Sequence, residues 1–159
     1  METITLGQKA PFFLLKDKDG IIHSLQEKKS NYVVVYFYPK DNTSGCTLEA
    51  VNFTRDLNKF EKKKTSIIGI SGGNEKTKTE FCKKNNLKIL LLSDPDFEVC
   101  RQYGAYGKKS FLGKSYMGIY RKTFLIDKNK RIIKIYEKVS PQVHSQQILI
   151  DIETMEKKQ

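Results

Sequence analysis

The chain has 159 residues, of which 38% are hydrophobic and 30% are charged, a composition that suits one soluble domain with a core of its own. No apolar run approaches the ~20 residues that a membrane helix needs. Residues 1–6 lack the basic and apolar regions of a signal peptide, so we expect a cytoplasmic protein. The net charge is +11, but the lysines are spread along the whole chain, which indicates a solvated surface; nucleic-acid binding is the alternative.

Strand and helix patterns alternate along the chain. The predicted elements are, in order, a hairpin (12–15 and 21–23), a buried strand (31–38), a helix (43–60), a buried strand (65–71), a helix (74 or 77 to about 86), a strand (89–92), a short helix (about 95–103), a Gly- and Lys-rich loop (105–118), a hairpin (122–126 and 131–136) and a final helix (141–156). On the helix over 43–60, four apolar residues are expected on one face: Leu48, Val51, Leu57 and Phe60.

Strand–helix–strand units in one sheet place helices on both of its faces. The predicted order is that of a three-layer, thioredoxin-like α/β sandwich, in which a central mixed sheet is flanked by helices and an N-terminal β-hairpin is added. We expect one such domain over residues 1–159.

The cysteines of the chain are Cys46, Cys82 and Cys100, and no Cys-x-x-Cys pair occurs. This small, odd number argues against a disulfide framework. The histidines His23 and His144 are distant in sequence from each other and from the cysteines, and zinc sites need closer spacing. We therefore expect neither a metal nor a cofactor.

The segment from Pro39 to Cys46 joins a predicted buried strand to a predicted helix, so Cys46 falls in the first helical turn. The first N–H groups of a helix have no partner inside it, and the positive end of the helix dipole favours a thiolate over a thiol. This placement predicts a reactive sulfur. The alternative is that Cys46 is a small buried apolar side chain.

The pattern Pro39-x-x-x-Thr43-x-x-Cys46 resembles the peroxidatic motif of peroxiredoxins, and the surrounding residues 36–50 resemble the Q-type, or bacterioferritin-comigratory, branch of that family. The resemblance covers nearly the whole chain. Further similar segments are Gly7-x-x-Ala10-Pro11-x-Phe13, Leu92-Ser93-Asp94 and the run from Arg121 to Asp127.

The resemblance implies a thiol peroxidase in which the Cys46 thiolate attacks hydrogen peroxide or an organic hydroperoxide. It assigns to Thr43 a hydroxyl that holds the peroxide and contacts the sulfur, and to Pro39 the shielding of the thiolate from water. Thr43 lies one helical turn from Cys46. An ordinary helix cap is the alternative for Thr43, and is compatible with catalysis.

The same resemblance implies that Arg121 stabilises the thiolate and orients the peroxide, and that the backbone N–H groups of Gly45 and Cys46 bind it. Glu49 would help to hold Arg121. Two alternatives stay open. Arg121 could be an ordinary cation at a strand edge, and Glu49 could be a first-turn acid favoured by the helix dipole.

Attack on peroxide would leave Cys46 as a sulfenic acid, which a second thiol can condense into a disulfide. Many members of this branch carry that thiol five residues after the nucleophile, where this chain has Val51. Other members carry it on the next helix, where Cys82 falls, so the resemblance implies a Cys46–Cys82 disulfide. We expect core packing for Cys100. The alternative is a one-cysteine enzyme resolved by an outside thiol.

Because disulfide formation requires Cα atoms within ~7 Å, we expect the first turns around Cys46 and part of the Cys82 helix to unwind on oxidation. By resemblance, thioredoxin or a similar thiol is the expected reductant and a monomer the expected state. Two further readings remain. One is a thiol–disulfide oxidoreductase on the same fold, and the other is a basic nucleic-acid-binding or chaperone-like module.

Overall fold

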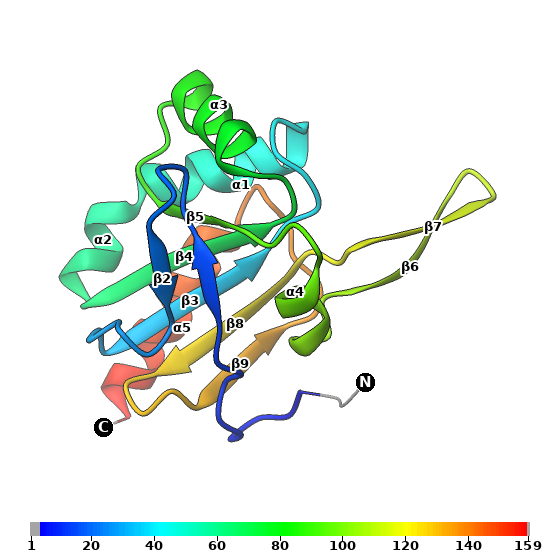
Figure 1. Ribbon diagram of the computed structural model, residues 1–159. Coiled ribbons are helices and arrows are strands. Elements are labelled where there is room, and N and C mark those ends of the chain that lie inside the picture. The colour runs from blue at the N-terminus through cyan, green and yellow to red at the C-terminus, as the bar shows by residue number, and fades with distance from the viewer. Residues whose placement is uncertain (1–3, 159) are drawn as a thin grey trace.

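The computed structural model describes residues 4–158, in which helices flank both faces of a seven-stranded sheet and a two-stranded ribbon projects from the body (Figure 1). The strands are β1 (Leu14–Lys16), β2 (Ile22–Ser24), β3 (Tyr32–Phe37), β4 (Thr65–Ser71), β5 (Leu90–Ser93), β6 (Tyr106–Phe111), β7 (Lys114–Ile119), β8 (Lys122–Asp127) and β9 (Ile132–Tyr136). The helices are α1 (Ser44–Arg55), α2 (Leu57–Lys62), α3 (Glu75–Asn85), α4 (Glu98–Gln102) and α5 (His144–Lys157).

The sheet has the strand order β2-β1-β5-β4-β3-β8-β9. Strands β3, β4 and β5 run parallel to one another, whereas β8 and β9 at one side and β1 and β2 at the other are antiparallel to their neighbours. The predicted mixed sheet flanked by helices is therefore confirmed. The predicted N-terminal hairpin is the pair β1–β2, which adds to the sheet through β1 and β5.

Strand β3 lies inside the sheet, and all six of its residues are buried. Successive side chains of a strand point to opposite faces, and this strand supplies both cores. Tyr32, Val34 and Tyr36 belong to the core under α1, α2, α3 and α5, whereas Val33 and Val35 belong to the core under α4 and the N-terminal segment. These two cores define the three layers.

The Gly- and Lys-rich segment 105–118 differs from the loop that its composition predicts. It forms most of an antiparallel ribbon, β6–β7, in which Phe111 pairs with Lys114 across the two-residue turn Leu112–Gly113. Both turn residues have positive φ, which matches the twist of a tight hairpin. Because the ribbon projects from the body (Figure 1), most of its side chains are exposed or half-buried, and it lacks the buried face that normally marks a strand by an apolar pattern.

The predicted single helix over 43–60 is also wrong in one respect, because it is divided at Asp56 into α1 and α2. The Asp56 carboxylate is buried and accepts a hydrogen bond from the Ser145 hydroxyl of α5 at 2.8 Å. The predicted apolar face was wrong for two of its four residues, whereas Phe60 is buried and Leu57 packs against the core. Leu48 and Val51 are exposed, whereas the buried face of α1 carries Cys46, Glu49, Ala50, Asn52 and Phe53.

Within residues 4–158, no helix is long and apolar enough to cross a membrane.

Candidate active site

Cys46 lies in the first turn of α1, after the loop that leaves β3, and its side chain is buried. Thr43 is the N-cap residue, so Cys46 is the third residue of the helix. The N–H groups of this turn have no acceptor within the helix, and the helix dipole favours negative charge beside them. The structure therefore gives the Cys46 sulfur the helix-start setting that the sequence predicts.

The register between β3 and β8 brings Arg121 to this sulfur. Phe37 pairs with Lys122, so the residue directly before β8 lies beside the carboxyl end of β3. Nη2 of Arg121 donates a hydrogen bond to Sγ of Cys46 at 3.3 Å. Desolvation lowers the pKa of Arg121, but attraction to Cys46 and Glu49 outweighs it and raises the pKa, so the guanidinium holds its charge. A permanent positive charge thus contacts the sulfur.

Glu49 follows Cys46 by one turn on the buried face of α1. Its Oε1 accepts a hydrogen bond from Nη1 of Arg121 at 2.9 Å. Burial raises the pKa of Glu49 to about 7, although Arg121 opposes the rise. Within the described residues, Oε2 has no hydrogen-bond partner. The structure brings the carboxyl and the guanidinium together, and the role of Glu49 in holding Arg121 stays a prediction.

Gly45 permits the close approach of Arg121. A Cβ built on Gly45 would lie 3.1 Å from Nη2 of Arg121 and 3.8 Å from Cγ of Pro141. The first is tighter than an ordinary contact, so a side chain here would require the guanidinium to shift by a few tenths of an ångström. Glycine at this position therefore leaves space for the arginine beside α1.

Thr43 and Pro39 belong to the loop before α1. The Thr43 side chain is exposed, and its hydroxyl donates its one proton to the Lys40 carbonyl at 2.8 Å rather than to the Cys46 sulfur. The alternative of an ordinary helix cap is wrong for this side chain, which makes no capping hydrogen bond because the hydroxyl turns back into the loop. Pro39 is half-buried at the end of β3.

All three cysteines are free thiols. Cys82 lies on α3 and packs in the same core as Cys46, where burial raises its pKa. Cys100 packs in the opposite core, and burial raises its pKa far above the usual range. The Cys46 and Cys82 thiols thus share one face of the sheet, and Cys100 lies on the other.

Comparison with known proteins gives the family. The sequence pattern of the AhpC/TSA family matches residues 6–135. Peroxiredoxin Bcp of Bacillus subtilis is 40% identical over 156 residues, covering 98% of this chain and 99% of the relative. The chain is a peroxiredoxin of the AhpC/TSA family. A putative peroxiredoxin bcp of Helicobacter pylori is 42% identical over 149 residues, covering 94% of this chain and 98% of the relative.

A solved structure supports the same placement. The bacterioferritin comigratory protein of Xanthomonas campestris, studied for its alkyl peroxide reduction activity, superposes with a TM-score of 0.84. It is 30% identical, and the match covers 90% of this peroxiredoxin and 91% of that chain. The thioredoxin-like α/β fold predicted from the sequence is thereby confirmed.

Sequence reasoning missed two polar residues of this peroxiredoxin that lie close to the motif. Asp41, in the loop before α1, and Lys78, on α3, form an ion pair of 2.9 Å with both side chains buried. The signal for Lys78 was available in the sequence, because Lys78, Phe81 and Cys82 have the spacing of one helix face. No comparable signal marks Asp41, since its partner is distant in sequence.

Proposed function

We propose that this peroxiredoxin reduces hydrogen peroxide and organic hydroperoxides through the thiolate of Cys46. The sulfur attacks one peroxide oxygen, the O–O bond breaks, and the other oxygen leaves as hydroxide or alkoxide and takes up a proton. Cys46 is oxidised to the sulfenic acid, and the peroxide is reduced to water or an alcohol. Such a step requires an ionised sulfur and stabilisation of the negative charge that develops on the oxygens.

The contact between Arg121 and Cys46 is the observation that carries this proposal. The planar guanidinium donates to the sulfur with Nη2 and to Glu49 with Nη1, and we assign to Glu49 the holding of the guanidinium in this orientation. A permanent charge held in this way lies beside the reacting sulfur, where it can stabilise negative charge in the transition state, and leaves the first-turn N–H groups of Gly45 and Cys46 for the peroxide. We assign to Thr43 the binding of the peroxide, for which its hydroxyl must leave the Lys40 carbonyl, and to Pro39 the exclusion of water.

For the second step we propose that Cys82 resolves the sulfenic acid. The Cys82 thiol attacks the Cys46 sulfur, an S–S bond forms, and the hydroxyl leaves as water. The location of both side chains in one core supports this pairing. Because Cys46 and Cys82 lie on separate helices, we propose that the first turn of α1 and part of α3 unwind to bring their two Cα atoms within ~7 Å.

We further propose that a dithiol reductant such as thioredoxin returns the disulfide to two thiols, and that the protein is a cytoplasmic monomer. The resemblance of the whole chain to the Q-type branch supports these assignments. The monomer is tested by sedimentation, because the β6–β7 ribbon exposes apolar side chains, among them Phe111, Leu112 and Met117.

Intact mass measured without reductant, after one equivalent of hydrogen peroxide, tests the scheme. We expect the wild type to lose two hydrogens, and the Cys100→Ser variant to do the same. Cys82→Ser should instead gain one oxygen, and Cys46→Ser should not react. Oxygen gain by the wild type without a disulfide would replace the scheme with a one-cysteine mechanism, and an inert Cys46 would refute the peroxidase.

A further inference from the structure

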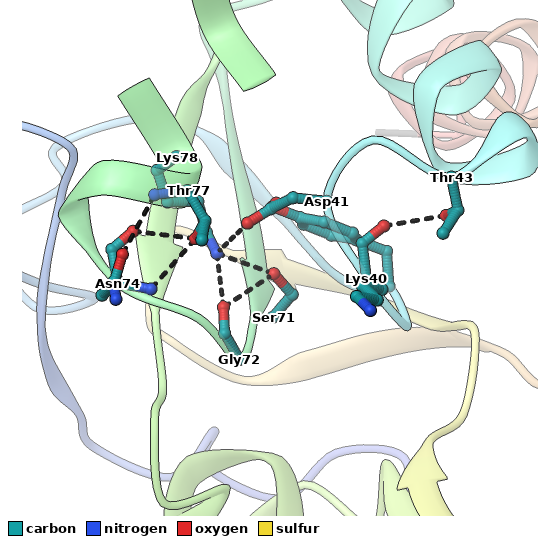
Figure 2. A network of polar contacts seen from close by, with 9 residues as sticks. Lys40, Asp41, Thr43, Ser71, Gly72, Asn74, Thr77 and Lys78 are labelled. Carbon is teal, nitrogen blue, oxygen red and sulfur yellow. Dashed lines mark hydrogen bonds and ion pairs between the residues drawn. The ribbon is translucent and has the colours of Figure 1, made fainter. Parts of the chain in front are cut away.

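Lys78 is a fully buried lysine, which is rare because an ammonium group taken from water must be paired. Its Nζ donates to Asp41 Oδ2 at 2.9 Å, to Ser71 Oγ at 2.8 Å and to the Gly72 carbonyl at 2.5 Å (Figure 2). These acceptors account for all three of its protons. Burial lowers the pKa of Lys78, and Asp41 opposes this effect. The amino group is therefore held by directed bonds.

Asp41 anchors the other end of the contact in the loop before α1. Its Oδ2 accepts from Lys78, and its Oδ1 accepts from the Tyr38 hydroxyl at 2.6 Å. The next residue, Asn42, has a left-handed backbone, and the Thr43 hydroxyl closes the turn onto the Lys40 carbonyl. Figure 2 shows how these contacts run from α3 to the loop. A shift of α3 would therefore pull on the segment that carries the peroxidatic motif.

Cys82 lies four residues after Lys78, so both side chains belong to the same face of α3. Lys78 also connects α3 to the end of β4 through Ser71 and Gly72. The turn of α3 that precedes Cys82 is thus tied to the sheet and to the loop before Cys46. Any unwinding of this turn must break the ion pair.

We propose that the Lys78–Asp41 ion pair is a latch, which holds α3 against the peroxidatic loop while Cys46 reacts and must open before Cys82 reaches the sulfenic acid. This inference rests on the proposed function and makes Lys78 and Asp41 positioning residues. The latch slows disulfide formation relative to the peroxide reaction. It therefore lengthens the lifetime of the sulfenic acid. A second peroxide molecule then has time to oxidise it to the sulfinic acid and is itself reduced to water or an alcohol.

The first test measures the opening of α3 in a Cys46→Ser protein, from the rates at which a thiol-reactive aromatic disulfide labels Cys82 and Cys100. Lys78→Met should accelerate the labelling of Cys82 at least tenfold while changing that of Cys100 little, because a lost coupling of ~1.4 kcal/mol gives a factor of ten. Cys100 is the internal control, since it lies in the opposite core. Equal acceleration at both cysteines would mean general destabilisation and would overturn the latch.

A second variant separates the loss of the ion pair from the cost of leaving a buried charge unpaired. Lys78→Met alone leaves the buried Asp41 carboxylate unpaired, whereas adding Asp41→Asn removes both charges. The double variant should accelerate the labelling of Cys82 to a similar extent. Lys76→Met, at an exposed position of the same helix, is the matched control and should label like the parent protein.

The second test uses the protein with all three cysteines and reads its products by intact mass over a series of peroxide concentrations. In the double variant, the peroxide concentration that yields equal amounts of disulfide and sulfinic acid should be roughly fivefold higher, or more, than in the wild type. An unchanged value would overturn the proposal. Because the labelling test uses a protein without Cys46, a failure of the proposed peroxidase function would show only in this second test.

Discussion

Replacing Glu49 with glutamine should change how the free energy of unfolding depends on pH. Burial raises the pKa of Glu49 from its ordinary 4.5 to about 7 in the folded protein. A carboxyl with a raised pKa binds its proton more tightly when folded. Its contribution to stability is therefore complete below about pH 4.5 and is lost as the pH rises through about 7.

The size of this effect follows from the two pKa values. At about 1.4 kcal/mol for each pKa unit, the rise is worth about 3 kcal/mol. Glutamine has the shape of the neutral acid and still offers an oxygen to Arg121, but it does not titrate. We expect the free energy of unfolding of the wild type, relative to Glu49→Gln, to fall by about 3 kcal/mol between pH 4.5 and pH 8.

The assay is urea unfolding of both proteins across this pH range, with Glu61→Gln as a control at an exposed position of α2. The comparison with a variant is needed because burial lowers the pKa of His144 to about 4, which gives the wild type an opposing trend. Parallel pH profiles for wild type and Glu49→Gln would refute the reasoning. A difference of the opposite sign would show that Arg121, rather than burial, dominates the ionisation of Glu49.

Three further outcomes are expected. In the wild type, the free energy of unfolding should fall as the pH drops from 6.5 through about 4, because the buried imidazole of His144 resists protonation in the folded protein. His144→Gln should lose this fall, as measured by urea midpoints across the pH range. Gly45→Ala should slow the reaction with peroxide about tenfold by displacing Arg121, while the free energy of unfolding holds or rises by up to ~1 kcal/mol; an unchanged rate would contradict this. Tyr38→Phe should lower the free energy of unfolding by about 2 kcal/mol through loss of the bond to Asp41, as measured by urea unfolding.

The sequence predicted the elements whose apolar side chains pack in a core. The continuous run of Val, Tyr and Phe in β3 marked a buried strand because both of its faces pack. Composition did not predict the strands β6 and β7, because neither strand has a buried face that would impose an alternating apolar pattern on its sequence. Composition also did not predict the division of the helix at Asp56, because the hydroxyl that binds this carboxylate comes from α5, which is distant in sequence.

For the candidate site, the family resemblance predicted that Arg121 and Glu49 lie with Cys46, and the register of β3 and β8 shows why Arg121 meets the sulfur. The orientation of the Thr43 hydroxyl depends on the turn geometry of its own loop, and composition does not encode that detail. The pairing of Lys78 with Asp41 required the packing of α3 against that loop. Such contacts between charged residues distant in sequence leave no periodic signal.

The central claim is that Arg121 makes the Cys46 sulfur a peroxidase nucleophile rather than merely a reactive thiol. Its most direct test compares the rate constants of Cys46 with hydrogen peroxide and with iodoacetamide, in wild type and Arg121→Met. Alkylation requires only the thiolate, whereas peroxide cleavage also requires charge stabilisation on oxygen, so we predict a loss of about 100-fold or more with peroxide and a much smaller loss with iodoacetamide. Equal losses with both reagents, or a wild-type peroxide rate no faster than that of free cysteine, would contradict the account.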